Sequence, residues 1–163
     1  MRLTTFGMFA VSLFLMLTPG EARAQEPACR DVSGAIAGNV TNPDTVVGVV
    51  MGDLEGATMA KITDQKEQGD GTMQVKLNHV FVTEARDSLQ TDDTAVWNPI
   101  PGKSGVFHMI TQYKITGGTG KFKKATGTLQ NHGEADTNRG LVTLGLHRPH
   151  LWHCSIRHLR GSN

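Results

Sequence analysis

Residues 73–83 read Met-Gln-Val-Lys-Leu-Asn-His-Val-Phe-Val-Thr, with apolar and polar side chains in alternation. Successive side chains of a β-strand point to opposite faces, so this pattern predicts a strand with one buried face. The apolar face carries Met73, Val75, Leu77, His79 and Phe81. The polar face carries Gln74, Lys76 and Asn78. No stretch of ten or more residues in the chain shows the spacing of an amphipathic helix.

Similar patterns lie on both sides of this stretch. Residues 46–51 form a β-branched run, and residues 126–131 and 141–146 are typical of strands. A second alternation places Phe107, Met109, Tyr113 and Ile115 on one face. Clusters rich in Gly, Pro, Asn and Asp separate these runs. Many short strands with one apolar face each predict an all-β fold, either a sandwich or an antiparallel barrel.

The composition limits the possible functions. A chain of 163 residues has room for one domain. The net charge of +1 provides no strong field for nucleic acid or an anionic membrane surface. With 38% hydrophobic residues the chain is not of the disordered class. We therefore expect a single folded domain that does not bind nucleic acid.

The first segment has the pattern of an export signal. Arg2 precedes an apolar run over residues 6–17, which is too short to span a bilayer, and a small-x-small cleavage pattern ends at Ala24. We predict a signal peptide over residues 1–24, cleaved after Ala24, and a single domain over residues 25–163. The mature protein would be secreted or periplasmic, with no membrane span. The alternative is an uncleaved membrane anchor.

The two cysteines lie near the ends of the predicted mature chain. In an oxidising compartment Cys29 and Cys154 could form a disulfide bond. Closing so long a loop would stabilise the fold by on the order of 4–5 kcal/mol. The bond requires the chain ends to meet, as they do when the first and last strands close a barrel. The alternative is two unpaired thiols.

Residues 115–127 read Ile-Thr-Gly-Gly-Thr-Gly-Lys-Phe-Lys-Lys-Ala-Thr-Gly and suggest a nucleotide-binding loop, but their spacing excludes it. A phosphate-binding loop requires Gly at the position of Ile115 and Ser or Thr at that of Phe122. Lys123 occupies the third glycine position of a dinucleotide-binding pattern. The glycines instead allow a tight connection after a strand, which lets Phe122 fold under a barrel end. The structural motif comprises Gly117, Gly118, Gly120, Phe122, Ala125 and Gly127. No cofactor is predicted.

This glycine-rich motif resembles the signature of the allene oxide cyclase and dirigent barrel superfamily, in particular its small exported members. Residues 77–83 and 91–96 also fit that group, and the resemblance covers roughly residues 32–145. It implies a closed antiparallel eight-stranded barrel, lipocalin-like (calycin-like), with an apolar lumen. Plant cyclases of this type are isomerases that close a fatty-acid allene oxide into a cyclopentenone, and dirigent relatives orient phenoxy radicals during coupling. Their active residues differ between branches, so no catalytic set carries over.

The candidate site residues are polar side chains on apolar strand faces. An eight-stranded barrel can hold one small ligand. His79 could transfer a proton and Tyr113 could donate a hydrogen bond to an epoxide or carbonyl oxygen. The ligand-binding wall would comprise Met73, Val75, Leu77, Phe81, Phe107 and Met109. Carboxylates that could assist at a barrel mouth are Glu55, Glu84 and Asp93. The alternative is a hydrogen-bonded core histidine and a capping tyrosine.

From these observations we expect an exported barrel that binds a small apolar molecule in its lumen. If it is an enzyme, it would be an intramolecular cyclase acting on an epoxide-type substrate. The alternatives are a non-enzymatic, dirigent-like protein and a structural or interaction barrel whose lumen is plugged by side chains.

The last segment, residues 146–163, is atypical for a closing strand. His147, His150 and His153 are of a metal-ligand type, but a strand would place His150 on the opposite face from the other two, and no metal site is predicted. Pro149 also removes a backbone donor from the sheet.

A shifted reading frame would explain this tail. The final strand of the resembling family ends in something like Thr-Gly-x-Ile-Cys-Gly. Suitable codons for residues 147–153, read one base later, encode Thr-Gly-His-Ile-Cys-Gly. We expect the tail beyond Leu146 to pack poorly and any Cys29–Cys154 bond to be strained or absent. Resequencing the codons for residues 140–157 tests this hypothesis.

Overall fold

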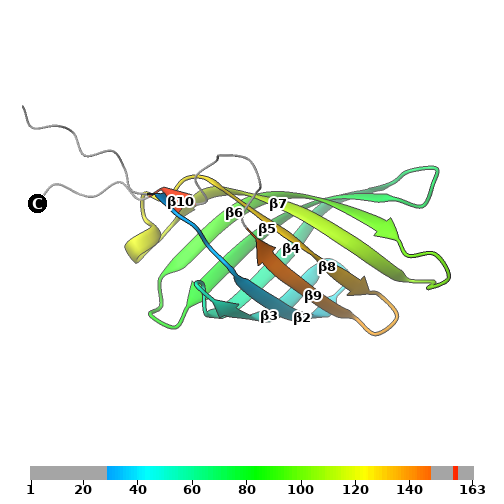
Figure 1. Cartoon of the computed structure of the whole chain (residues 1–163), viewed down its shortest axis with the longest axis horizontal. Helices are drawn as coiled ribbons and strands as arrows, with labels where there is room; N and C mark the ends of the chain where they lie inside the picture. Colours follow the sequence, from blue (N-terminus) through cyan, green and yellow to red (C-terminus); the bar gives the residue numbers. More distant parts are fainter. Residues whose placement is uncertain (1–28, 148–155, 158–163) are drawn as a thin grey trace, which may run out of the picture.

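The computed structural model describes residues 29–147 and 156–157, and it is all-β apart from one short 3-10 helix. Eight strands close into one antiparallel barrel, each paired with its neighbours in sequence (Figure 1). Pairing of the first and last barrel strands, with Gly34 opposite Leu146, closes the ring. The predicted eight-stranded antiparallel barrel is therefore confirmed. Its strands are β2 (Gly34–Asn42), β3 (Thr45–Gly52), β4 (Gly56–Glu67), β5 (Met73–Thr83), β6 (Ser88–Pro99), β7 (Val106–Gly118), β8 (Thr128–Asp136) and β9 (Leu141–His147).

Two short strands form a separate two-stranded sheet. β1 (Cys29–Arg30) pairs with β10 (Ile156–Arg157), so the backbone at Cys29 lies opposite Arg157. The predicted signal peptide, the partner cysteine Cys154 and most of the tail lie outside the described residues, and the predictions made for them stay predictions. The part of the chain that the structure describes contains no helix with the length and apolar character needed to cross a membrane.

The alternation in the sequence corresponds to the two faces of the barrel wall. In β5 the side chains of Val75, Leu77, His79 and Phe81 are buried in the lumen, and Gln74, Lys76 and Asn78 are exposed. β7 repeats this arrangement, with Met109, Tyr113 and Ile115 buried and His108, Gln112 and Lys114 exposed. Both predicted apolar faces are confirmed.

Three barrel strands, β2, β4 and β6, have weaker signals in the sequence. β2 reads Gly-Ala-Ile-Ala-Gly-Asn-Val-Thr-Asn, and small residues favour strands little. Each of these strands is hydrogen-bonded on both sides, so sheet pairing supplies what local preference does not. β8 begins at Thr128 and continues to Asp136, beyond the 126–131 run predicted for it.

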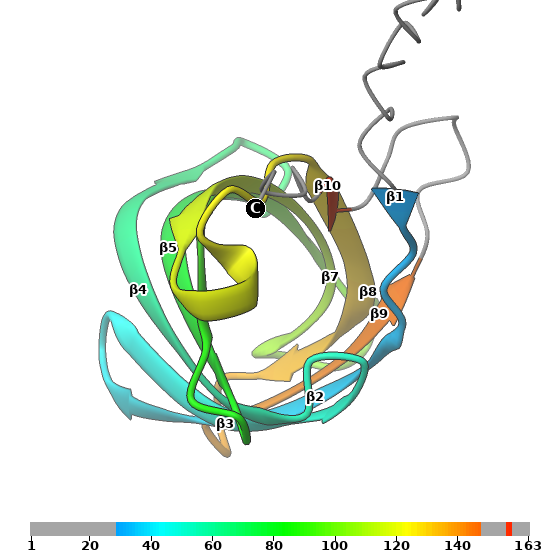
Figure 2. The same cartoon turned by 90° about the vertical axis from the view of Figure 1, so that its left-hand side faces the viewer.

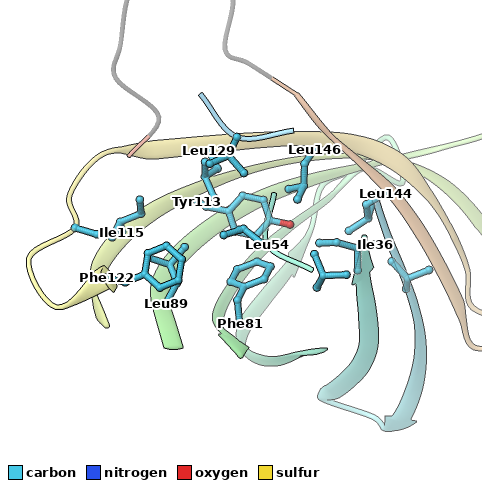
Figure 3. Close-up of a cluster of buried hydrophobic side chains, with 14 of the residues drawn as sticks. Ile36, Leu54, Phe81, Leu89, Tyr113, Ile115, Phe122, Leu129, Leu144 and Leu146 are labelled. Atoms are coloured by element: carbon cyan, nitrogen blue, oxygen red, sulfur yellow. The ribbon is translucent and has the colours of Figure 1, made fainter. Parts of the chain in front are cut away.

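One end of the barrel is closed. The 3-10 helix η1 (Gly120–Phe122) lies over this end, which faces the viewer in Figure 2. Phe122 is only 2% exposed. It packs in what we call the closed-end cluster, whose members are Phe81, Leu89, Tyr113, Ile115, Phe122 and Leu129 (Figure 3). Gly120 has a φ of +51°, and a Cβ there would overlap the Asp87 carboxylate. The predicted placement of Phe122 under a barrel end is confirmed.

The opposite end is framed by the β2–β3 and β8–β9 turns and their neighbours. Val40 N donates to Gly140 O at 2.8 Å, and Thr137 N donates to Gly105 O at 2.8 Å. Figure 1 places the β8–β9 turn and η1 at opposite ends of the barrel. The barrel thus has one end filled by side chains and one end framed by hydrogen-bonded turns.

Candidate functional site

A buried polar cluster crosses the lumen between the two ends. It is built from lumen-facing positions of four consecutive strands, where the alternation that supplies apolar side chains elsewhere places polar ones. Its members are His79 on β5, Thr91 and Asp93 on β6, Thr111 and Tyr113 on β7, and Asn131 on β8, all of them buried.

His79 and Asp93 form the central contact of this cluster. His79 Nδ1 lies 2.5 Å from Asp93 Oδ2, and the Asp93 side chain is fully buried. Burial raises the pKa of Asp93, and the hydrogen bond with His79 opposes this rise. Because Nδ1 is held by Asp93, Nε2 is the ring nitrogen left to face a ligand or a water.

Tyr113 lies next to this pair. The Asn131 amide Nδ2 donates a hydrogen bond to Tyr113 Oη. The Tyr113 ring meets His79 edge-on, with 5.1 Å between ring centroids, and its hydroxyl points away from Phe122 (Figure 3). Burial raises the pKa of Tyr113, so the phenol keeps its proton and acts as a hydrogen-bond donor and acceptor.

Two spaces that share four lining residues lie beside this cluster and near the open end of the barrel. The first is an enclosed cavity of about 30 Å³ lined by residues that include His79, Leu77 and Met109, which is room for one water. The second, which we call the mouth cavity, has about 310 Å³. That volume is at the lower end of the range for small-molecule sites. The residues that line both spaces are Val46, Ile62, Trp97 and Val142.

Trp97 is the polar group at the junction of these two spaces. Its ring packs against Phe107, with 6.0 Å between ring centroids. Its Nε1 atom is buried and has no hydrogen-bond partner among the residues that the structure describes. The sequence analysis missed Trp97, although it continues the alternation of Leu89, Thr91, Asp93 and Ala95 along β6.

The other predicted site residues are distributed along the barrel. Leu77 and Met109 line the enclosed cavity with His79. Val75 is buried beside Leu77, while Met73 and Phe107 are half-buried. Phe81 belongs to the closed-end cluster with Tyr113. These residues therefore do not all face one common space.

The predicted carboxylates occupy two different environments. Glu55 and Glu84 are exposed, and their segments are joined by a hydrogen bond from Glu84 N to Glu55 O. Asp93, expected at a barrel mouth, is instead buried beside His79, because its position in β6 faces the lumen. Within the described part of the chain, no group of three His, Cys, Asp or Glu side chains could hold a metal ion.

The outside of the barrel is apolar on one side. Five exposed side chains form what we call the apolar outer face: Val47, Val49, Met51, Met59 and Val82. They lie on β3 and the two strands that follow it, and Val49 is 57% exposed. The neighbouring outer surface of β5–β7 carries polar residues such as Lys76, Asp92 and Gln112. An exposed apolar patch can mark a surface that contacts another molecule.

The raised pKa of Asp93 predicts a pH-dependent stability. The Asp93 carboxyl holds its proton more tightly in the folded protein than in the unfolded chain. The contribution of this proton to the free energy of unfolding is therefore complete below about pH 4 and is lost as pH rises through the folded-state pKa of Asp93. Relative to Asp93→Asn, which cannot ionise, the native protein should lose up to about 1.4 kcal/mol per pH unit above pH 4. Urea unfolding of both proteins between pH 3 and 8 measures this difference. A difference that is constant with pH, or that grows in favour of the native protein, would contradict the assignment.

Comparison with known proteins finds no matching family model, no matching curated protein and no matching solved structure.

Proposed function

We propose that this protein binds one small, largely apolar molecule in the mouth cavity of its barrel. The observation that carries this proposal is the difference between the two barrel ends. Phe122 and its neighbours fill one end, whereas the other contains the mouth cavity, which shares four lining residues with the small cavity beside His79. The walls of this space include Val46, Ile62, Trp97 and Val142, which offer mainly apolar contact.

This proposal fits the lipocalin-like barrel and the export that the sequence predicts. An eight-stranded barrel has an interior just wide enough for side chains or one small ligand. Here side chains fill most of the lumen, so the ligand body would lie in the mouth cavity. A cyclase or isomerase activity would further require a reacting atom of the substrate to reach His79 through the junction at Trp97.

Two neighbouring positions on β3 test the binding site. Val46 faces the mouth cavity, and Val47 faces outward. We expect the neutral fluorophore N-phenyl-1-naphthylamine to bind the native protein with an increase in fluorescence. Val46→Phe should weaken this binding at least about tenfold by filling the cavity, and Val47→Phe should leave it unchanged.

Thermal unfolding of both variants provides the control for folding. If Val47→Phe abolishes binding and Val46→Phe does not, the probe binds the apolar outer face and the proposed site is wrong. If the native protein does not bind the probe, and native mass spectrometry finds no copurified small molecule, the proposed function is wrong.

An interaction barrel with a filled lumen is the second candidate function. Two observations favour it: the enclosed cavity holds only about 30 Å³, and the apolar outer face is exposed. In this case the native protein should self-associate in sedimentation velocity, and Val49→Lys should abolish this self-association and leave the monomer folded. A native protein that is monomeric at all concentrations argues against this candidate.

A further inference from the structure

We infer that a second copy of this chain docks on the apolar outer face, so that two barrels pack face to face about a two-fold axis. The inference names the partner that the second candidate function requires. It does not depend on ligand binding in the mouth cavity, because the docking face lies on the outside of the barrel wall.

The register of the strands makes the apolar outer face continuous. Val49 on β3 lies between Ala37 on β2 and Ala57 on β4. Val82 on β5 lies opposite Ala57 and extends this row of outward side chains. A second outward row crosses β9 and β2–β5, and its members are Leu141, Asn39, Val47, Met59 and Val80. Uncharged side chains therefore cover one side of the barrel, where β2, β3 and β4 form the lower left part of the wall in Figure 2.

The shape of this surface suits a copy of itself. An open hollow of about 800 Å³ lies on the face, and Ala37 and Ala57 are among the residues that line it. Val49 is a larger side chain between these two alanines, and it is 57% exposed. When Val49 of one copy lies over Ala57 of the other, a two-fold axis places the second Val49 over the first Ala57. The face is thus self-complementary, as a two-fold interface requires.

The area of the face is sufficient for a dimer. Outward side chains are about 4.8 Å apart between strands and about 6.7 Å apart along a strand, so each covers roughly 32 Å². About a dozen uncharged outward positions on β9 and β2–β5 therefore cover roughly 400 Å² in projection. The accessible surface of protruding side chains is larger than their projection, and a stable interface buries at least about 500 Å² on each partner. The face and its polar rim together reach this area.

The charges at the borders of the face favour a second copy over a charged partner. Within the described part of the chain, no residue that lines the hollow is charged. Lys61, which follows the face along β4, pairs with Asp44 at 2.5 Å, and Arg30 pairs with Asp53 at 3.4 Å. These ion pairs leave no net charge to attract an anionic membrane or a charged protein. A second uncharged face covers this one without burying an unpaired charge.

Two substitutions of the same kind test the docking face. In sedimentation velocity the native protein should form a dimer whose fraction rises with concentration. Val49→Lys would bury an unpaired charge at the two-fold axis and should weaken association at least about 100-fold. Val96→Lys is the matched control, because Val96 is an exposed valine on the outer surface of β6; it should leave association unchanged.

A mixture of two variants tests the two-fold arrangement. Val49→Lys and Val49→Glu should each be monomeric, because like charges would face each other across the axis. An equimolar mixture should regain the dimer, since the introduced ammonium and carboxylate groups attract each other. This recovery also shows that both variants are folded.

Three results would overturn the inference: a native protein that stays monomeric at every concentration, dissociation by Val96→Lys but not by Val49→Lys, or charge variants that remain monomeric when mixed. Cosedimentation of a monomeric native protein with phosphatidylcholine vesicles would assign the face to lipid and would also overturn it. None of these results bears on ligand binding in the mouth cavity. Conversely, a dimeric native protein that does not bind N-phenyl-1-naphthylamine would contradict the proposed ligand binding and leave the docking inference standing.

Discussion

Replacing Phe122 with alanine is expected to lower the free energy of unfolding by about 3–5 kcal/mol. The Phe122 ring is buried in the closed-end cluster with Leu89, Ile115 and Leu129, and its removal leaves a cavity that the hydrogen-bonded turns of this end resist filling. Such a loss is a large part of the 5–15 kcal/mol that typically stabilises a domain. Urea unfolding followed by Trp fluorescence measures the change.

Lys123→Ala is the matched control for this prediction. Lys123 lies next in the chain and is exposed, so its replacement should change stability by no more than about 0.5 kcal/mol. If Phe122→Ala has an equally small effect, η1 does not close the barrel and our description of this end is wrong.

Replacing His79 with leucine should lower the free energy of unfolding by about 3–5 kcal/mol at neutral pH. The substitution leaves the fully buried Asp93 carboxylate without its imidazole partner. Because burial raises the pKa of Asp93, this carboxyl takes up a proton more readily than an exposed one, and the loss should be smaller at pH 5 than at pH 8. Urea unfolding at the two pH values tests both expectations.

Two further variants separate this pair from general effects of substitution. Asn78 is the exposed neighbour of His79 and bonds to Asp92 at 3.1 Å, so Asn78→Leu repeats the substitution at a surface pair and should change stability by no more than about 0.5 kcal/mol. The double variant His79→Leu/Asp93→Leu replaces the buried pair by apolar side chains and should be more stable than His79→Leu alone. A double variant that is less stable than His79→Leu would show that the pair is not the source of the loss.

The barrel was predictable from the sequence where one strand face is strongly apolar. The alternation around Leu77 and Met109 assigned the lumen side chains of β5 and β7 correctly, because side-chain direction in a strand has a period of two. β2 and β4 were not predictable in this way, since their small and polar residues show no strong alternation and these strands are held by pairing on both sides, β2 with β3 and β9, and β4 with β3 and β5. A choice between sandwich and barrel likewise depends on the β2–β9 pairing, which no local pattern encodes.

The candidate site was predictable only in part. His79 stood out as a polar residue in an apolar row, and it does lie in the lumen. Asp93 and Trp97 have the same period-two position along β6. The contact of Asp93 with His79 depends on the β5–β6 register, whereas the position of Trp97 at the mouth cavity depends on the closure of the ring. The residues that line both cavities come from four different strands, so their meeting follows from the barrel geometry and not from a motif.

The most direct test of ligand binding in the mouth cavity is a methyl-group NMR titration of the native protein with N-phenyl-1-naphthylamine. The methyl signals of Val46, Ile62 and Val142 report on the mouth cavity, and those of Val49 and Met59 report on the apolar outer face. We predict saturable shifts confined to the first group. Shifts confined to the second group, or no saturable shifts in either, would contradict the proposed function.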